Sequence, residues 1–151
     1  MQTFAINNSI LDEKNQIIVK KYLQDVNLIG KANYSFLIWD IYDAELYSNK
    51  NKFNPDKFIV ALKYNRQINK DRLVNETIED IKEQKNINIA KYDSWKKLLN
   101  SVYKSTEKGK IFLAVKVNKS EAVFFYDGKL LHKSNDMEFN ELFFNIWLRK
   151  N

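Results

Sequence analysis

Residues 122–148 read AVFFYDGKLLHKSNDMEFNELFFNIWL, and this stretch decides the fold. Asp127-Gly128 separates two short apolar runs, and because both residues tolerate the positive φ of a type I′ turn, the pattern predicts a two-residue β-hairpin. Asn135 and Asp136 then open a helix predicted over about residues 137–148. The apolar residues on one side of that helix are Phe139, Leu142, Phe143, Ile146 and Trp147. The tail therefore predicts a sheet covered by an aromatic-rich helix.

Three more strands are predicted upstream of the hairpin. Residues 32–47 form one long extended run with an apolar middle on both faces, which is typical of a central strand covered on both sides. Residues 58–64 alternate next and predict a second strand, antiparallel to the first. Residues 111–117 alternate again after Gly109 and predict the strand that leads into the hairpin.

Two helices are predicted between these strands. Asn69 caps the first helix, and Asp71 lies in its first turn, where a carboxylate complements the helix dipole. Its apolar face consists of Leu73, Val74, Thr77, Ile78 and Ile81. Residues 85–90 are predicted as a connector, and Asp93 or Ser94 as the cap of the second helix. The apolar stripe of that second helix consists of Trp95, Leu98, Leu99, Val102 and Tyr103.

Residues 1–27 are predicted as an N-terminal extension with two alternative structures. Ser9-x-x-Asp12 is a capping-box variant that starts a helix, whereas the β-branched Ile17-Ile-Val19 favours a strand. Gly30 then marks a break before the long strand. Strands, two helices, more strands and a last helix indicate an α+β fold. We expect a single domain over residues 1–151, in which a large antiparallel sheet carries helices mainly on one face.

The composition is that of a globular chain with a modest basic charge. Its 151 residues are 44% hydrophobic and 14% aromatic, which excludes a disordered protein. The net charge of +6 comes from lysines interleaved with acids, since only Arg66, Arg72 and Arg149 are arginines. Nucleic-acid-binding proteins usually concentrate cations on one face and use arginine. We therefore expect a solvated surface and no nucleic-acid partner, with a surface for nucleic acid or anionic lipid as the alternative.

Targeting signals are not apparent. The chain has no cysteine, so disulfides, thiolate metal sites and thiol nucleophiles are excluded. Met1 to Asn8 lack the cationic and apolar regions of a signal peptide. The longest apolar run, Phe36 to Trp39, is too short to span a bilayer. The sequence favours the cytoplasm, with a disulfide-free periplasmic protein as the alternative.

No residue cluster identifies a reaction, a metal or a cofactor. His132 is the only histidine, and no Cys or second His accompanies it, so we expect no zinc site and a solvent-facing side chain at a strand end. Asp43 and Glu45 share a strand face and form a candidate carboxylate pair, although solvated strand residues are the simpler interpretation. Neither glycine-rich phosphate-binding pattern occurs. Catalytic residues are therefore not assigned, and neither a metal nor a cofactor is expected.

Aromatic residues are numerous enough either to fill the core or to line an elongated apolar pocket. Those on the predicted strands are Tyr34, Phe36, Trp39, Tyr42, Phe58, Tyr64, Phe124 and Tyr126. At the end of the second strand and the start of the helix, Tyr64, Arg66 and Lys70 are the candidate polar ligand-binding residues. An arginine at the mouth of such a pocket suits a carboxylate, because its fork binds both oxygens.

Several segments in order resemble one family, the bacterial chalcone isomerase-like proteins. Leu28-Ile-Gly30 and Ile41-Tyr-Asp-Ala-Glu-Leu-Tyr47 are similar to the family's glycine turn and its "VYDAxLY" strand. Phe58 to Arg66, with the helix to Gln84, resembles the "LxYxR" strand and its helix. Phe124-Phe-Tyr-Asp-Gly128 resembles the "FYxNG" hairpin. Asp136-x-x-Phe139 with Phe143-Phe-Asn-Ile-Trp-Leu148 resembles the closing helix. The resemblance covers residues 28 to 149.

The resemblance implies an open-faced β-sandwich with an apolar cleft between sheet and helices. In the plant isomerases the cleft closes a flavanone ring, and relatives without that activity hold fatty acids. The plant enzymes use an arginine, whose position here falls between Lys31 and Tyr34, and a threonine, whose position falls on Tyr42. Their tyrosine and asparagine positions fall near Lys70 and Thr77, with Asn75 two residues away.

These departures indicate that flavanone formation is not the function, because losing an electrostatic clamp costs several kcal/mol of transition-state stabilisation. The resemblance implies instead a non-catalytic protein that binds a small apolar or fatty-acid-like ligand. The alternative is an intramolecular lyase or isomerase acting on an unknown substrate. The candidate ligand-binding residues are Lys31, Tyr42, Tyr64, Arg66, Lys70 and Thr77.

Overall fold

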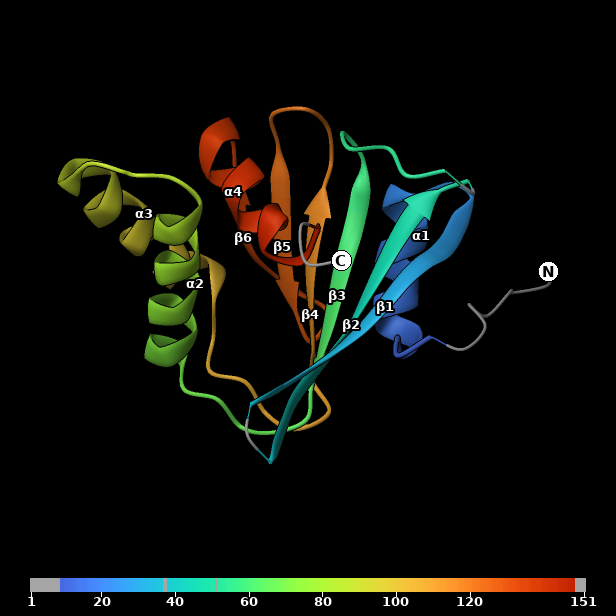
Figure 1. The fold of residues 1–151 in the computed structure, drawn as a ribbon. Coiled ribbons are helices and arrows are strands. Elements are labelled where there is room, and N and C mark those ends of the chain that lie inside the picture. Colours follow the sequence, from blue (N-terminus) through green and yellow to red (C-terminus); the bar gives the residue numbers. More distant parts are fainter. Residues whose placement is uncertain (1–8, 37, 51, 149–151) are drawn as a thin grey trace.

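A computed structural model describes residues 9–148 apart from residues 37 and 51 (Figure 1). The predictions for Met1 to Asn8, the side chain of Phe36 and residue 149 lie outside the described residues. Six strands of the described residues form one antiparallel sheet in the order β1-β2-β3-β4-β5-β6, with α2 and α3 inserted between β3 and β4. Their bounds are β1 Val26–Phe36, β2 Trp39–Asn49, β3 Phe58–Tyr64, β4 Ile111–Lys116, β5 Ala122–Tyr126 and β6 Lys129–Ser134. With four helices in the described residues, this confirms the α+β prediction.

The helices lie unequally on the two faces of the sheet (Figure 1). Helices α2 (Lys70–Gln84), α3 (Ile89–Val102) and α4 (Met137–Leu148) cover one face, which we call the α2–α4 face. Helix α1 (Glu13–Tyr22) packs on the opposite face, which we call the α1 face. The prediction of helices mainly on one face is therefore confirmed.

The C-terminal hairpin and helix form as their local sequence predicts. Asp127 and Gly128 have φ angles of 51° and 81°, as a type I′ turn requires. The Asp136 carboxylate accepts a hydrogen bond from the N–H of Phe139 at 3.0 Å and caps α4. The same carboxylate accepts from the indole of Trp95 at 2.8 Å, so it also joins α3 to α4.

The predicted long strand over residues 32–47 is wrong, because the chain reverses inside it. Strand β1 ends at Phe36 and β2 begins at Trp39, and the two pair antiparallel over ten residue pairs. Ile38 lies in the turn with 87% of its surface exposed. An apolar run therefore occupies a turn without Gly, Pro or Asn. The single strand predicted here is consequently a hairpin at one edge of the sheet. The strand that is buried along its whole length is β4.

Two helix starts and one glycine also differ from prediction. Asn88 caps α3 and accepts from the N–H of Lys91 at 2.8 Å, so Asp93 and Ser94 lie inside the helix. Asp12 caps α1 directly, which selects the helical alternative for the N-terminal segment. Gly30 lies inside β1 beside a register shift and does not precede the strand.

Polar groups anchor the N-terminal segment to the α1 face. Glu45 is 2% exposed and accepts hydrogen bonds from the N–H of Ile10, at 2.9 Å, and from the Tyr47 hydroxyl. The Ser9 hydroxyl lies 2.5 Å from the same Tyr47 oxygen. Leu11, Val19 and Leu23 are buried close by. The segment before β1 is thus held to the sheet by both hydrogen bonds and apolar packing.

Candidate functional site

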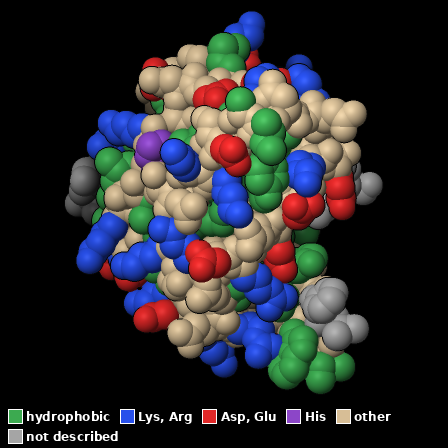
Figure 2. Space-filling view, turned by 90° about the vertical axis from the view of Figure 1, so that its left-hand side faces the viewer, with side chains coloured by type: hydrophobic (Ala, Val, Ile, Leu, Met, Phe, Trp, Pro, Cys, Tyr) green, Lys and Arg blue, Asp and Glu red, His purple; other side chains and the backbone are tan. Residues whose placement is uncertain are grey.

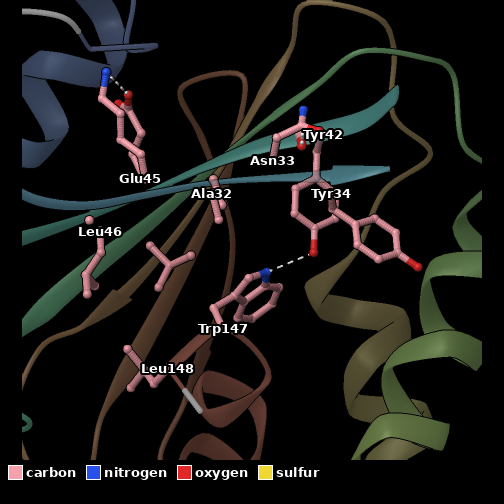
Figure 3. Close-up of a pocket in the computed structure, with 12 residues that line it drawn as sticks. Ala32, Asn33, Tyr34, Tyr42, Glu45, Leu46, Trp147 and Leu148 are labelled. Carbon is pink, nitrogen blue, oxygen red and sulfur yellow. Dashed lines mark hydrogen bonds and ion pairs between the residues drawn. The ribbon is translucent and has the colours of Figure 1, made fainter. Parts of the chain in front are cut away.

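Two hollows open on the α2–α4 face, and they meet at three aromatic side chains. The first, the α4 hollow, has a volume of about 250 Å³ and lies between β1, β2, β3 and the end of α4 (Figure 3). The second, the α2 hollow, has a volume of about 410 Å³ and lies between the same strands, α2 and α4. Tyr34, Tyr42 and Trp147 line both hollows.

The register of β1, β2 and β3 explains where the space arises. Three cross-strand rows face the helices, because successive residues of a strand point to opposite faces. One row contains three tyrosines, Tyr34, Tyr42 and Tyr64. The next row begins with Ala32 and Ala44, whose side chains are too short to reach α4. The α4 hollow therefore lies over this pair of alanines.

Gly30 adds to the open space beside Ala32 and Ala44. A Cβ added to Gly30 would lie 3.6 Å from the Cβ of Leu46, which is an ordinary contact distance, and the φ of Gly30 is not in the left-handed region. The glycine is required neither by backbone strain nor by a close approach. Its effect on the site is to leave volume open on the wall of the α4 hollow.

Trp147 separates the two hollows. Its indole N–H donates to the Tyr42 hydroxyl at 3.2 Å, as Figure 3 shows, and this bond joins the last turn of α4 to β2. The Tyr34 ring stacks on the Tyr42 ring with 5.1 Å between centroids. Tyr42 also meets Tyr64 edge-on at 5.9 Å. A movement of the Trp147 side chain would therefore join the hollows into one elongated cavity.

Hydroxyl groups gather in the α2 hollow. Thr77 and Tyr103 share a hydrogen bond of 2.9 Å. Tyr64 is 2% exposed, its side chain lines this hollow, and none of the described side chains hydrogen-bonds to its hydroxyl. Burial raises the pKa of Tyr42 to about 12 and raises the pKa of Tyr64 and Tyr103 above the usual range of a phenol. At neutral pH these groups are all protonated, so they act as neutral hydrogen-bonding groups and not as bases.

The structure separates the six predicted site residues. Tyr42, Tyr64 and Thr77 line the α2 hollow together, and Lys31 lies at the edge of the α4 hollow. The Lys31 ammonium lies 3.7 Å from the Glu45 carboxylate. Figure 3 shows Glu45 on the opposite side of the strands from Trp147 and Leu148.

The other two predicted residues line neither hollow. The Arg66 guanidinium lies over the Trp39 ring, 3.9 Å from its centroid. The backbone N–H of Lys70 donates to the Ser105 hydroxyl at 2.9 Å. Of the aromatic pocket candidates, Phe58, Phe124 and Tyr126 are core residues.

The remaining chemical candidates take structural positions. Glu45 is buried against the N-terminal segment, and Asp43 accepts from the side-chain amide of Asn33 at 2.8 Å. Both carboxylates line a third hollow of about 420 Å³ on the α1 face, beside Lys31. His132 is half-buried in β6 and lines neither hollow. The described residues contain no group of three or more His, Cys, Asp or Glu suited to a metal ion.

Sequence reasoning missed several residues of the site. Trp147 was predicted only as a helix-face residue, and Ala32 and Ala44 only as strand residues, yet together they shape the α4 hollow. Acidic residues of α2, among them Glu76 and Asp80, form one wall of the α2 hollow. The available signal was the pair of small residues on neighbouring strands, and it becomes visible only once the β1–β2 hairpin is known.

The outer surface shows mixed charge. In Figure 2 basic and acidic side chains are interspersed over the side of the molecule that carries α2 and α3. Within the described part of the chain, no helix combines the length and the apolar character needed to cross a bilayer.

Comparison with known proteins gives a family and a fold. The sequence profile of a family described as chalcone isomerase-like matches residues 11–151. The crystal structure of a fatty-acid binding protein from Arabidopsis thaliana is similar, with a TM-score of 0.59 and 14% sequence identity. That similarity covers 85% of this chain and 80% of the Arabidopsis chain, and at this identity it shows a shared fold. No curated protein matches the chain.

Proposed function

The chain belongs to the chalcone isomerase-like family, and from that premise we propose that it is a non-catalytic protein binding a small, chain-shaped apolar molecule between sheet and helices. The observation that carries the proposal is the pair of adjoining hollows, about 250 and 410 Å³, that share Tyr34, Tyr42 and Trp147. Small-molecule sites in proteins have volumes of roughly 300–1,000 Å³, a range that the α2 hollow reaches alone and the α4 hollow only together with it. The fatty-acid binding function named for the similar Arabidopsis protein supports a ligand with an alkyl chain.

The apolar part of the ligand is assigned to the α4 hollow. Leu46, Val60, Trp147 and Leu148 surround the floor made by Ala32 and Ala44. Removing an alkyl chain from water against such side chains is favourable by roughly 25 cal/mol per Å² of apolar surface. The hydroxyls of Tyr42, Tyr64 and Thr77 then lie in the adjoining α2 hollow, where they orient a polar end.

The chemistry of the hollows supports binding over catalysis. An intramolecular lyase needs a base or a cation beside the reacting oxygen. The phenols here have raised pKa values, and among the described lining residues the one cationic side chain is Lys31, which faces Glu45. Turnover of chalcones and related enones, lost in Arg66→Ala, would favour the lyase alternative.

Filling the α4 hollow tests the proposal. Calorimetric titration of the delipidated protein with decanol should give saturable binding to one site. Ala32→Phe places a ring in the hollow and should weaken that binding at least about tenfold, which corresponds to about 1.4 kcal/mol. Ala90→Phe is the matched control, because Ala90 is exposed in α3 and lines neither hollow. Unsaturable binding, or equal affinity in both variants, would contradict the proposal.

A further inference from the structure

The floor beneath the two hollows is continuous. Ala44 pairs with Ala32 on β1 and with Leu62 on β3, so these three residues form one cross-strand row. Ala32 and Ala44 line the α4 hollow, and Leu62 lines the α2 hollow. The row runs from one hollow into the other, so the sheet itself does not divide them. The division lies above the sheet, on the side of α4.

The last described turn of α4 supplies this division. Ile146 lines the α2 hollow, Leu148 lines the α4 hollow, and Trp147 between them lines both. The indole N–H of Trp147 donates to the Tyr42 hydroxyl at 3.2 Å, which connects the helix to the sheet (Figure 3). Trp147 and Tyr42 together therefore form a partition between the two spaces.

The Trp147 side chain has room to leave this position. An indole has one polar N–H, and 3.2 Å is at the long end of the usual range for an N–H···O hydrogen bond. The ring meets Phe143 edge-on, with 5.0 Å between centroids. In a close-packed interior a ring is held by neighbours on every side, whereas Trp147 has hollows of about 250 and 410 Å³ beside it. The indole can therefore turn away from Tyr42.

Volume decides which guests need this movement. Each carbon or oxygen group of an alcohol occupies roughly 30 Å³, about the volume of a water molecule in the liquid. Hexanol, with seven such groups, needs roughly 210 Å³ and fits the α4 hollow alone. Decanol, with eleven, needs roughly 330 Å³ and must extend into the α2 hollow. A guest of that length cannot occupy both hollows while the partition is closed.

We propose that Trp147 is a gate that selects guests by length. Short guests bind in the α4 hollow with the gate closed, and longer guests require the indole to leave the Tyr42 hydroxyl. This inference rests on the proposed function and adds the residue that sets the size of the guest. The polar end of a long guest replaces the indole N–H as the donor to the Tyr42 oxygen, so that oxygen keeps a partner in both states.

Trp147→Phe tests the gate, because it removes the N–H and keeps an aromatic ring. In calorimetric titrations of the full-length protein, the variant should bind decanol about fivefold more tightly than the wild type. That change is the equivalent of about 1 kcal/mol, for the hydrogen bond that no longer has to break. Hexanol, which needs no opening, should bind equally to both proteins.

The sign of the decanol result separates a gate from a fixed wall. If Trp147 were only a wall of the site, the smaller ring would bury less of the guest, and the variant would bind decanol more weakly. Weaker or unchanged decanol binding would therefore overturn the inference and leave the proposed function standing. If neither alcohol binds to the wild type, the proposed function fails, and the inference fails with it.

Trp39→Phe is the matched control. Trp39 is 46% exposed and lines neither hollow, so this variant should leave the affinities for hexanol and decanol unchanged. A gain in decanol affinity equal to that of Trp147→Phe would mean that the partition is not its source, and it would overturn the inference.

A double-mutant cycle with Tyr42→Phe identifies the hydrogen bond as the latch. Tyr42→Phe removes the acceptor and keeps the tryptophan ring. In that background, Trp147→Phe should change the decanol affinity by less than about twofold, because no bond remains to be broken. A fivefold gain that persists without the Tyr42 hydroxyl would overturn the inference, since ring size would then be the cause.

A series of alcohols gives a second measurement on the wild type alone. Burying each added methylene should raise the affinity roughly fourfold. Between heptanol and nonanol, where the α4 hollow is full, one step should show almost no gain, because opening the gate offsets it. An even rise from hexanol to decanol would overturn the inference.

Discussion

The two faces of the sheet differ in the hydrogen bonding of a buried tyrosine. On the α1 face, Glu45, Tyr47 and Ser9 bond to one another and hold the N-terminal segment in place. On the α2–α4 face, the Tyr64 hydroxyl has no partner among the described side chains, and Ala32 and Ala44 leave space below α4. The α1 face is not free of space, because a separate hollow of about 420 Å³ opens beside Ser9, Lys31 and Glu45. The two adjoining hollows that share Tyr34, Tyr42 and Trp147 lie on the α2–α4 face, and this is where a ligand is expected.

The largest difference between the faces should appear in leucine truncations. Leu113 is fully buried on the α1 face, whereas Leu62 is 1% exposed and lines the α2 hollow. Leu113→Ala should cost about 4 kcal/mol of unfolding free energy, because it opens a new cavity in close packing. Leu62→Ala should cost about 2 kcal/mol, because part of its surroundings is already empty. Urea unfolding measures both, and equal costs would mean that the faces are packed alike.

Removing single hydroxyls should give the next difference. Tyr47→Phe takes a donor from buried Glu45 and should destabilise the protein by about 2 kcal/mol. Tyr64→Phe removes a group without a described partner and should change the unfolding free energy by less than about 0.5 kcal/mol. Thermal and urea unfolding of the two variants provide the comparison. A large loss in Tyr64→Phe would show that its hydroxyl stabilises the fold.

The smallest effect concerns alkaline pH. Burial raises the pKa of Tyr42 to about 12 from an unfolded value of 10.0, so the folded state keeps this proton while the unfolded state loses it. The contribution of this raised pKa to the unfolding free energy is complete below pH 10 and is lost as pH rises toward 12. As pH rises from about 9 to 11, the unfolding free energy of Tyr42→Phe should therefore fall by roughly 1 kcal/mol less than that of the wild type. If the unfolding free energies of the wild type and Tyr42→Phe depended on pH in the same way, Tyr42 would have to be exposed to solvent.

Local chemistry predicted the C-terminal half of the fold well. Asp127 and Gly128 adopt the positive φ angles that a two-residue turn requires, and Asp136 caps the last helix. The N-terminal hairpin was missed because its turn is apolar. Phe36-Leu-Ile-Trp39 has no turn-forming residue, so the alternation of side chains on both sides of it predicted one continuous strand.

The site was predictable only in part, because a hollow is defined by volume that is missing. Tyr42, Tyr64 and Thr77 were expected from their strand and helix positions and from family resemblance, and they lie in one hollow. The floor of Ala32 and Ala44 depends on a hairpin register that sequence patterns did not reveal. Arg66 lies over Trp39, a contact between residues 27 positions apart, 66 minus 39, that no local pattern reports.

Two-dimensional amide NMR with decanol tests the central claim, that the α2–α4 face holds an apolar guest while the packed core of the α1 face does not. The account predicts saturable shifts of the Trp147 indole N–H and of the amides of Ala44, Leu46 and Val60, with Leu113 and Val19 unchanged. Shifts centred on α1, or spectra unchanged at saturating decanol, would contradict it.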